Sequence, residues 1–229
     1  MYNQFEDSCY GTQTKRNTVF QTRLLGLNRL CPELVYQGLS PAQLAPKADN
    51  AFPVPNIWRE NGRGGNVSYR ERLLSLFQMT EQCLGMSIGG QMSQTLNVAC
   101  LNESNDLSEA MRQLSHAQGH PSILLLDVKA HPFSGANLEQ AKRQIDDKTT
   151  ICLGTYTAYV ILLLSLFENN SKDYWFVCPN DEYRYSYGST CGVFPCLGSR
   201  DGALELVSVM NNDNYGSLAF MTTERAFLI

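Results

Sequence analysis

The 229-residue sequence has few histidines and only short basic clusters, and each shortage excludes a class of function. It has three histidines, and no cysteine or histidine pair has the spacing of a zinc site, so we expect no metal centre. It also lacks a glycine-rich phosphate loop, so we expect no cofactor. Charged residues make up 17% of the chain, the net charge is -4, and basic clusters are short. This composition argues against nucleic-acid binding.

A long hydrophobic run is also missing. The longest, Ala158 to Phe167, is about half of the roughly 20 residues that a membrane-spanning helix needs, so it predicts either a buried central strand or a core helix. The first residues lack the basic and then apolar pattern of a secretory signal. The eight cysteines are scattered. We therefore expect no membrane association and free, mostly buried thiols in a reducing, intracellular compartment.

The length predicts a single domain, 1–229, whose character changes near its middle. Apolar spacing and capping residues predict helices in the first half, and β-rich runs predict strands in the second. The expected helices cover residues 15–30, 41–44, 69–84, 106–119 and 201–212, and the expected strands lie within 121–130, 149–167, 172–179 and 188–198. This order predicts an α+β fold with a helical lobe over about 1–119 and a sheet lobe over about 120–229.

The segment "YGTQTKRNTVF", Tyr10 to Phe20, leads into the first predicted helix. It resembles the papain-like deubiquitinases of the herpesvirus large-tegument-protein type. In that family a Gly-x-Gln-Cys-x-x-Asn segment starts the central helix, and its cysteine is the nucleophile. Gly11, Gln13 and Asn17 match this frame, while Thr14 stands in place of the cysteine. Gln4 is the candidate for the upstream glutamine that donates to the oxyanion.

The second half continues the resemblance. In the family a strand, a hairpin and an aromatic-rich strand end in Phe-Asp-x-His, which supplies the base and its orienting acid. Here "TYTAYVILLL" and "DYWFVCPN" take those places, with Cys178 and Asn180 where the acid and the histidine stand. A glycine, Gly188, then a short strand and a helix in "GALELVSVM" follow in order. The resemblance implies a papain-like cysteine-protease fold with a helical N-terminal half and an antiparallel sheet in the C-terminal half.

The replaced residues change the expected chemistry. A cysteine peptidase needs a thiolate, a base and a group that orients the base, and Thr14, Asn180 and Cys178 stand at these three positions. The resemblance thus implies a pseudoenzyme, cytoplasmic or virion-associated, that binds ubiquitin or a ubiquitin-like modifier or serves as a scaffold. The expected binding residues are Gln13, Asn17, Tyr183, Tyr185 and Tyr187. The alternating tyrosines suit a contact surface, or equally a hairpin with one face packed on the core.

Two other interpretations stay open. In the first, the protein is an active thiol hydrolase, a deubiquitinase or cysteine protease, that uses Cys9 as nucleophile with His131 and Asp127 as base and acid. In the second, it is an unrelated structural or interaction protein of α+β fold, and the motif match is a coincidence.

Overall fold

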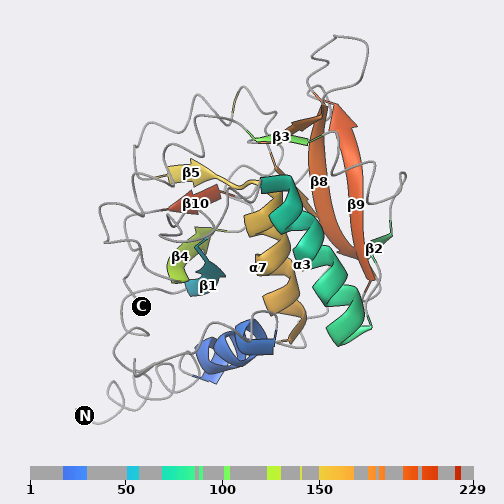
Figure 1. Cartoon of the computed structure of the whole chain (residues 1–229). Helices are drawn as coiled ribbons and strands as arrows, with labels where there is room; N and C mark the ends of the chain where they lie inside the picture. The colour runs from blue at the N-terminus through green and yellow to red at the C-terminus, as the bar shows by residue number, and fades with distance from the viewer. Residues whose placement is uncertain are drawn as a thin grey trace, which may run out of the picture.

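The computed structural model describes thirteen parts of the chain (Figure 1). They are residues 18–29, 51–56, 69–85, 88–89, 101–103, 123–129, 140, 150–167, 175–178, 181–183, 193–200, 203–210 and 220–222.

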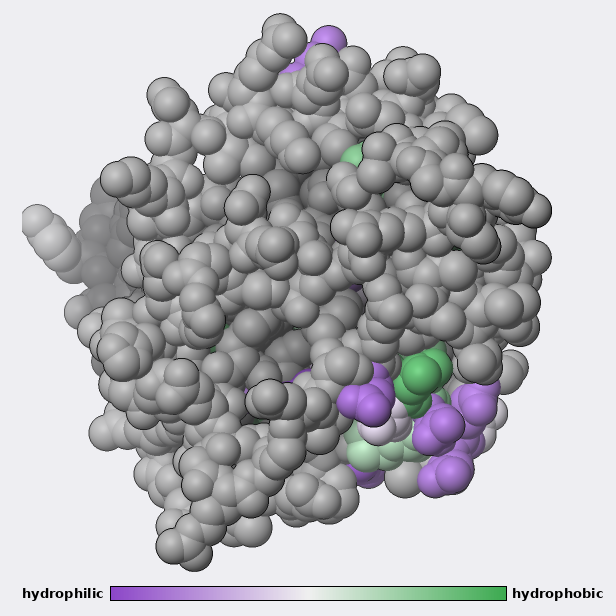
Figure 2. All heavy atoms as spheres, turned by 45° about the horizontal axis from the view of Figure 1, so that its top comes forward, coloured by the Kyte–Doolittle hydropathy of each residue, from purple (hydrophilic) through white to green (hydrophobic). Residues whose placement is uncertain are grey.

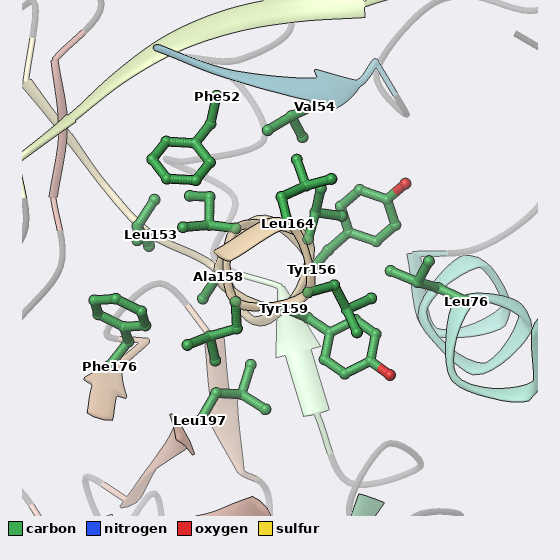
Figure 3. Close-up of a cluster of buried hydrophobic side chains, with 14 of the residues drawn as sticks. Phe52, Val54, Leu76, Leu153, Tyr156, Ala158, Tyr159, Leu164, Phe176 and Leu197 are labelled. Atoms are coloured by element: carbon green, nitrogen blue, oxygen red, sulfur yellow. The ribbon is translucent and has the colours of Figure 1, made fainter. Parts of the chain in front are cut away.

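Helix α7, Thr155–Phe167, is the centre of the core. Residues 155–164 are all buried, so the helix is buried around its whole circumference, as expected of a helix that is apolar on every side. Figure 3 looks along α7 and shows buried side chains from other parts of the chain, such as Phe52, Leu76 and Leu197, arranged around it. The core helix that the sequence allowed for Ala158 to Phe167 is therefore confirmed. The strands predicted over 149–167 are wrong except for the short strand β5, Thr150–Cys152.

Sheet A covers one side of the core. Its strand order is β1-β4-β10-β5, and each neighbouring pair is antiparallel. The strands are β1, Ala51–Pro55, β4, Ile123–Lys129, β10, Phe220–Thr222, and β5, Thr150–Cys152. The strand predicted within 121–130 is confirmed as β4. Strand β1 was not expected, because its two prolines weaken the strand signal.

Sheet B has the order β2-β9-β8-β6. Its strands are β2, Ile88–Gly89, β9, Ala203–Met210, β8, Val193–Arg200, and β6, Trp175–Val177. Strand β2 runs parallel to β9, and the other pairs are antiparallel. Strands β8 and β6 confirm the strands predicted within 188–198 and 172–179.

The helix predicted over 201–212 is wrong, because this stretch forms β9. Leu204 and Leu206 are buried, whereas Glu205 and Val207 are half-buried, which is the two-residue period of a strand. Arg200 pairs with Ala203, and the two residues between them in the sequence are Asp-Gly, a strong hairpin signal. The pairing with β8 outweighs the helix propensity of "ALEL".

Two helices confirm their sequence patterns. The helix over residues 18–29 has one buried face, and α3, Tyr69–Leu84, buries Leu73 and Phe77. Gly85 ends α3 in the left-handed conformation, with φ of 63°, and its N–H donates to the Glu81 carbonyl at 3.1 Å. The helices expected over 41–44 and 106–119 lie outside the described residues.

The protein is an α+β fold of helices and largely antiparallel sheets, as expected. Its lobes, however, differ from the expected division. Strands β1 and β2 and the short strand β3, Leu101–Glu103, come from the first half, yet each pairs with a strand from the second half. The central helix α7 also comes from the second half. Among the described helices, none combines the length and apolarity needed to cross a membrane.

Candidate functional site at the buried end of helix α7

The N-terminus of α7 is closed by a carboxylate from far along the chain. The first N–H groups of a helix need acceptors, which the side chain of the preceding residue often supplies. Gly154 precedes α7, accepts from the Ala158 N–H at 3.0 Å and has no side chain. Asp181 supplies the acceptor instead: the Thr155 N–H donates to its Oδ2 at 2.6 Å. Asp181 is fully buried, and its charge complements the helix dipole.

The end of β6 positions Asp181. The Cys178 N–H donates to the Pro195 carbonyl at 2.8 Å, but Pro195 has no N–H to return the second bond of an antiparallel pair. The Cys178 carbonyl instead accepts from the Asp181 N–H at 3.2 Å. Pro195 thus ends the pairing of β6 with β8. Strand β7, Asp181–Tyr183, begins there and pairs with β3.

The thiol of Cys178 lies in the same cluster and is fully buried. Its Sγ donates to the Phe176 carbonyl at 3.6 Å. Burial raises the pKa of this thiol well above its ordinary value, and the Asp181 charge and Cys196 raise it further, while the Thr155 hydroxyl and the Leu197 backbone oppose the change. Cys178 is therefore a protonated thiol at neutral pH, and neither a nucleophile nor an anion that could orient a base.

Three of the residues singled out from sequence lie in the described parts. Cys178 follows β6 of sheet B, and Asp127 is half-buried in β4 of sheet A, where it pairs with Ala51 and Thr222. Tyr183 pairs with Leu101 in the β3–β7 sheet. Cys178 and Asp127 thus belong to different sheets. The others lie outside the described residues: Gln4, Cys9, Gln13, Thr14, Asn17, His131, Asn180, Tyr185 and Tyr187. The two alternative catalytic sets therefore stay predictions.

Sequence reasoning missed Asp181 and Thr155. It took the segment that begins at Asp181 as a row of tyrosines and gave its first acid no role. One local signal was present, since proline and asparagine precede Asp181 and proline is typical of the second position of a turn. The helix that Asp181 caps begins 26 residues earlier, so no local pattern could have predicted the pairing.

The cluster of Thr155, Cys178 and Asp181 can stabilise the fold. Among the described residues, however, it has no group that could carry out chemistry on a substrate. Its carboxylate, thiol and hydroxyl groups are all buried, and no cationic or histidine side chain contributes to the shift of the Cys178 pKa. In the described parts of the chain, no three His, Cys, Asp or Glu residues are placed to hold a metal ion. The arrangement joins α7 to sheet B at a fixed point.

The surface of the described residues also has no large hydrophobic patch of the kind that is typical of a ligand-binding site. Leu25, on the helix over residues 18–29, is the exposed large hydrophobic side chain among the described residues. On the face drawn in Figure 2, the described surface lies mainly at lower right, where hydrophilic residues surround a small hydrophobic group. No protein-family model, curated protein or solved structure matches the chain.

Proposed function

We propose that this protein is a non-catalytic module of the papain-like deubiquitinase type that binds a protein partner, with ubiquitin or a ubiquitin-like modifier as the partner class. The frame of Gly11, Gln13 and Asn17 supports the family, and the loss of the cysteine at Thr14 supports the lack of catalysis. The observation that carries the proposal is the state of Cys178. This residue stands where the family has its orienting acid, and it is a buried, protonated thiol.

The absence of catalysis follows from the chemistry of the three replaced positions. A threonine hydroxyl is a weak nucleophile without an adjacent base, and the Asn180 side chain does not accept a proton at neutral pH. A protonated Cys178 offers no negative charge to orient a base. Loss of even one member of a catalytic triad removes most of its rate enhancement. With all three catalytic residues replaced, the function that remains for the fold is binding.

Two measurements on the whole chain test this proposal. The first is incubation with ubiquitin that carries an electrophilic C-terminus, followed by intact mass analysis. The second is a titration of unmodified ubiquitin. We expect no covalent adduct and saturable binding. Tyr185→Ser and Tyr187→Ser should weaken the binding, while the matched Tyr185→Phe and Tyr187→Phe variants, which keep the aromatic area, should retain most of it.

An adduct on a cysteine would overturn the absence of catalysis. The alternative thiol hydrolase predicts an adduct on Cys9 that disappears in Cys9→Ala and persists in the control Cys31→Ala. It also predicts a slower reaction in Asp127→Asn. The absence of both adduct and binding would overturn the partner class and direct the search to other proteins.

A further inference from the structure

Strands β3 and β7 form a two-stranded sheet that is separate from sheets A and B among the described strands. Each strand has only three residues, Leu101–Glu103 and Asp181–Tyr183. A two-stranded sheet of this kind is at best marginally stable in water unless it packs against another element. The β3–β7 pair must therefore be stabilised by its contacts with the rest of the protein.

The charges within the pair work against it. Its six residues include three acids and no basic residue. Glu103 stands opposite Asp181 in the register, and like charges at directly opposite positions destabilise an antiparallel pair. A compensating positive charge has to come from outside the pair. The N-terminus of α7, which the Asp181 carboxylate contacts, supplies it through the helix dipole.

Asp181 joins the pair to the core. Its Oδ2 accepts from the Thr155 N–H at 2.6 Å, and its own N–H donates to the Cys178 carbonyl at 3.2 Å. The side chain is fully buried at the N-terminal end of α7, near which Figure 1 shows β3. Strand β7 also lies beside β8, but among the described strands β8 pairs with β6 and β9 and not with β7. The pair is thus held at the first residue of β7.

We infer that Asp181 is a latch for the β3–β7 pair. The pair opens as a local unit while α7 and the two larger sheets stay folded, and it opens only when the Asp181 carboxylate leaves the N-terminus of α7. Elements with few stabilising contacts open in this way in native proteins. Tyr183 ends β7 and is the first of the tyrosines expected to contact a partner, so the latch fixes one end of that segment. The inference itself does not depend on the proposed partner.

Native-state hydrogen exchange of the whole chain tests the latch, under conditions in which the opening equilibrium limits exchange. In the unchanged protein, the amides that the β3–β7 pairing protects should have protection factors at least about tenfold lower than those of α7. Asp181→Ala should lower the protection of α7 by about 30-fold. It should lower the protection of the pair by the same factor or remove it, because the same hydrogen bond breaks in local opening and in complete unfolding.

The control is Glu71→Ala, which removes an exposed acid from the first turn of α3 and should leave exchange in the pair unchanged. Asp181→Asn keeps an oxygen acceptor and should lower the protection of both regions by a smaller factor. If Asp181→Ala does not fold, Asp181→Asn decides in the same way.

Two results would overturn the inference. In the first, the unchanged protein shows no protection of the pair, or as much as in α7, so that the pair is not a latched local unit. In the second, the Asp181 variant loses protection in α7 while the pair keeps its own. Asp181 would then cap the helix without holding the strands.

Discussion

The backbone N–H of Thr155 and the carboxylate of Asp181 are 2.6 Å apart, although 26 residues separate them in the sequence. The bond joins the first turn of the central helix to the start of β7. Because Gly154 has no side chain to cap the helix, the carboxylate that does so must come from elsewhere. The first turn of the central helix is therefore capped by one buried acid that lies 26 residues further along the chain.

Replacing Asp181 by alanine should destabilise the protein by about 2 kcal/mol, because it removes a helix cap and leaves a buried N–H without its acceptor. Asp181→Asn keeps an oxygen acceptor and should lose less. Urea unfolding followed by circular dichroism measures both. The control is Glu71→Ala, which removes an exposed acid from the first turn of α3 and should cost less than about 1 kcal/mol. Equal losses for Asp181→Ala and Glu71→Ala would contradict the capping role.

Stability should fall steeply in alkali, because several buried acids resist ionisation. Burial raises the pKa of Cys196 from 9.0 to about 12, and it also raises the pKa values of Cys178 and Tyr159. The unfolded chain then loses these protons first as pH rises, so the folded state binds more protons and its stability decreases with pH. This decrease of stability with pH is absent below a pH of about 9. The ionisation of Cys196 alone should lower the free energy of unfolding by about 1.4 kcal/mol per pH unit, up to a pH of about 12.

Cys196→Ala isolates one of these groups. Its stability relative to the unchanged protein should improve as pH rises above about 9, in urea titrations at a series of pH values. The control Leu25→Ala changes an exposed side chain that does not ionise, so its stability difference from the unchanged protein should stay constant over the same pH range. A constant difference between Cys196→Ala and the unchanged protein across the alkaline range would show that Cys196 ionises equally in both states.

The sequence predicted well those elements whose signals are local. Helix α3 shows both its apolar face and the glycine that ends it, and the apolar run of β4 is flanked by polar residues. The run from 155 to 167 was ambiguous, because a fully buried helix and a buried strand have the same continuous apolar pattern. The strands predicted there gave too little weight to the length of the run, because thirteen residues are typical of a helix and long for a strand. Nothing local could predict that Asp181 would cap this helix.

Strand β9 shows how a tertiary contact overrides propensity. "ALEL" begins with good helix formers, yet this stretch pairs along its full length with β8. The structure of β1 has a similar cause, since its prolines are compatible with a strand only at an edge. Both assignments required knowledge of the neighbouring strand. The candidate site was equally non-local, because Cys178 and Asp181 form one turn, whereas Thr155 lies more than twenty residues earlier in the chain.

Tyr159→Phe should change stability by less than about 1 kcal/mol or increase it slightly. The Tyr159 hydroxyl is buried, and among the described residues it has no hydrogen-bond partner of suitable geometry. The Thr80 hydroxyl is near enough to act on the pKa of Tyr159, but it donates to the Leu76 carbonyl at 2.8 Å. Removing an unsatisfied buried hydroxyl relieves a desolvation penalty.

The contact of the Tyr159 ring with Phe77, in contrast, should contribute strongly to the stability of the core. It packs edge to face against Phe77, with ring centroids 4.5 Å apart at 62°. Phe77→Ala should therefore cost about 3–5 kcal/mol, because it opens a cavity beside the central helix. Thermal unfolding compares the two variants. A large loss in Tyr159→Phe would mean that the hydroxyl has a partner outside the described residues.

Gly198→Ala should destabilise the protein through a single contact with Trp175. These residues face each other in the β6–β8 register, and a Cβ at position 198 would lie closer to the indole ring than van der Waals contact allows. The half-buried ring must then move, which should cost about 1–3 kcal/mol. In a Trp175→Ala background the same change should cost almost nothing, because the clash is gone and alanine suits a strand better than glycine.

Urea unfolding of the two single variants and the double variant gives the coupling energy between positions 175 and 198, which should be at least about 1 kcal/mol. Gly85→Ala is the control. Its cost should come from the left-handed backbone, φ of 63°, since a Cβ there would meet nothing within 4 Å. That cost should therefore be the same with and without Trp175. If Gly198→Ala behaved like Gly85→Ala, the indole would not be the group that requires glycine at position 198, and the close approach of β6 to β8 would need another cause.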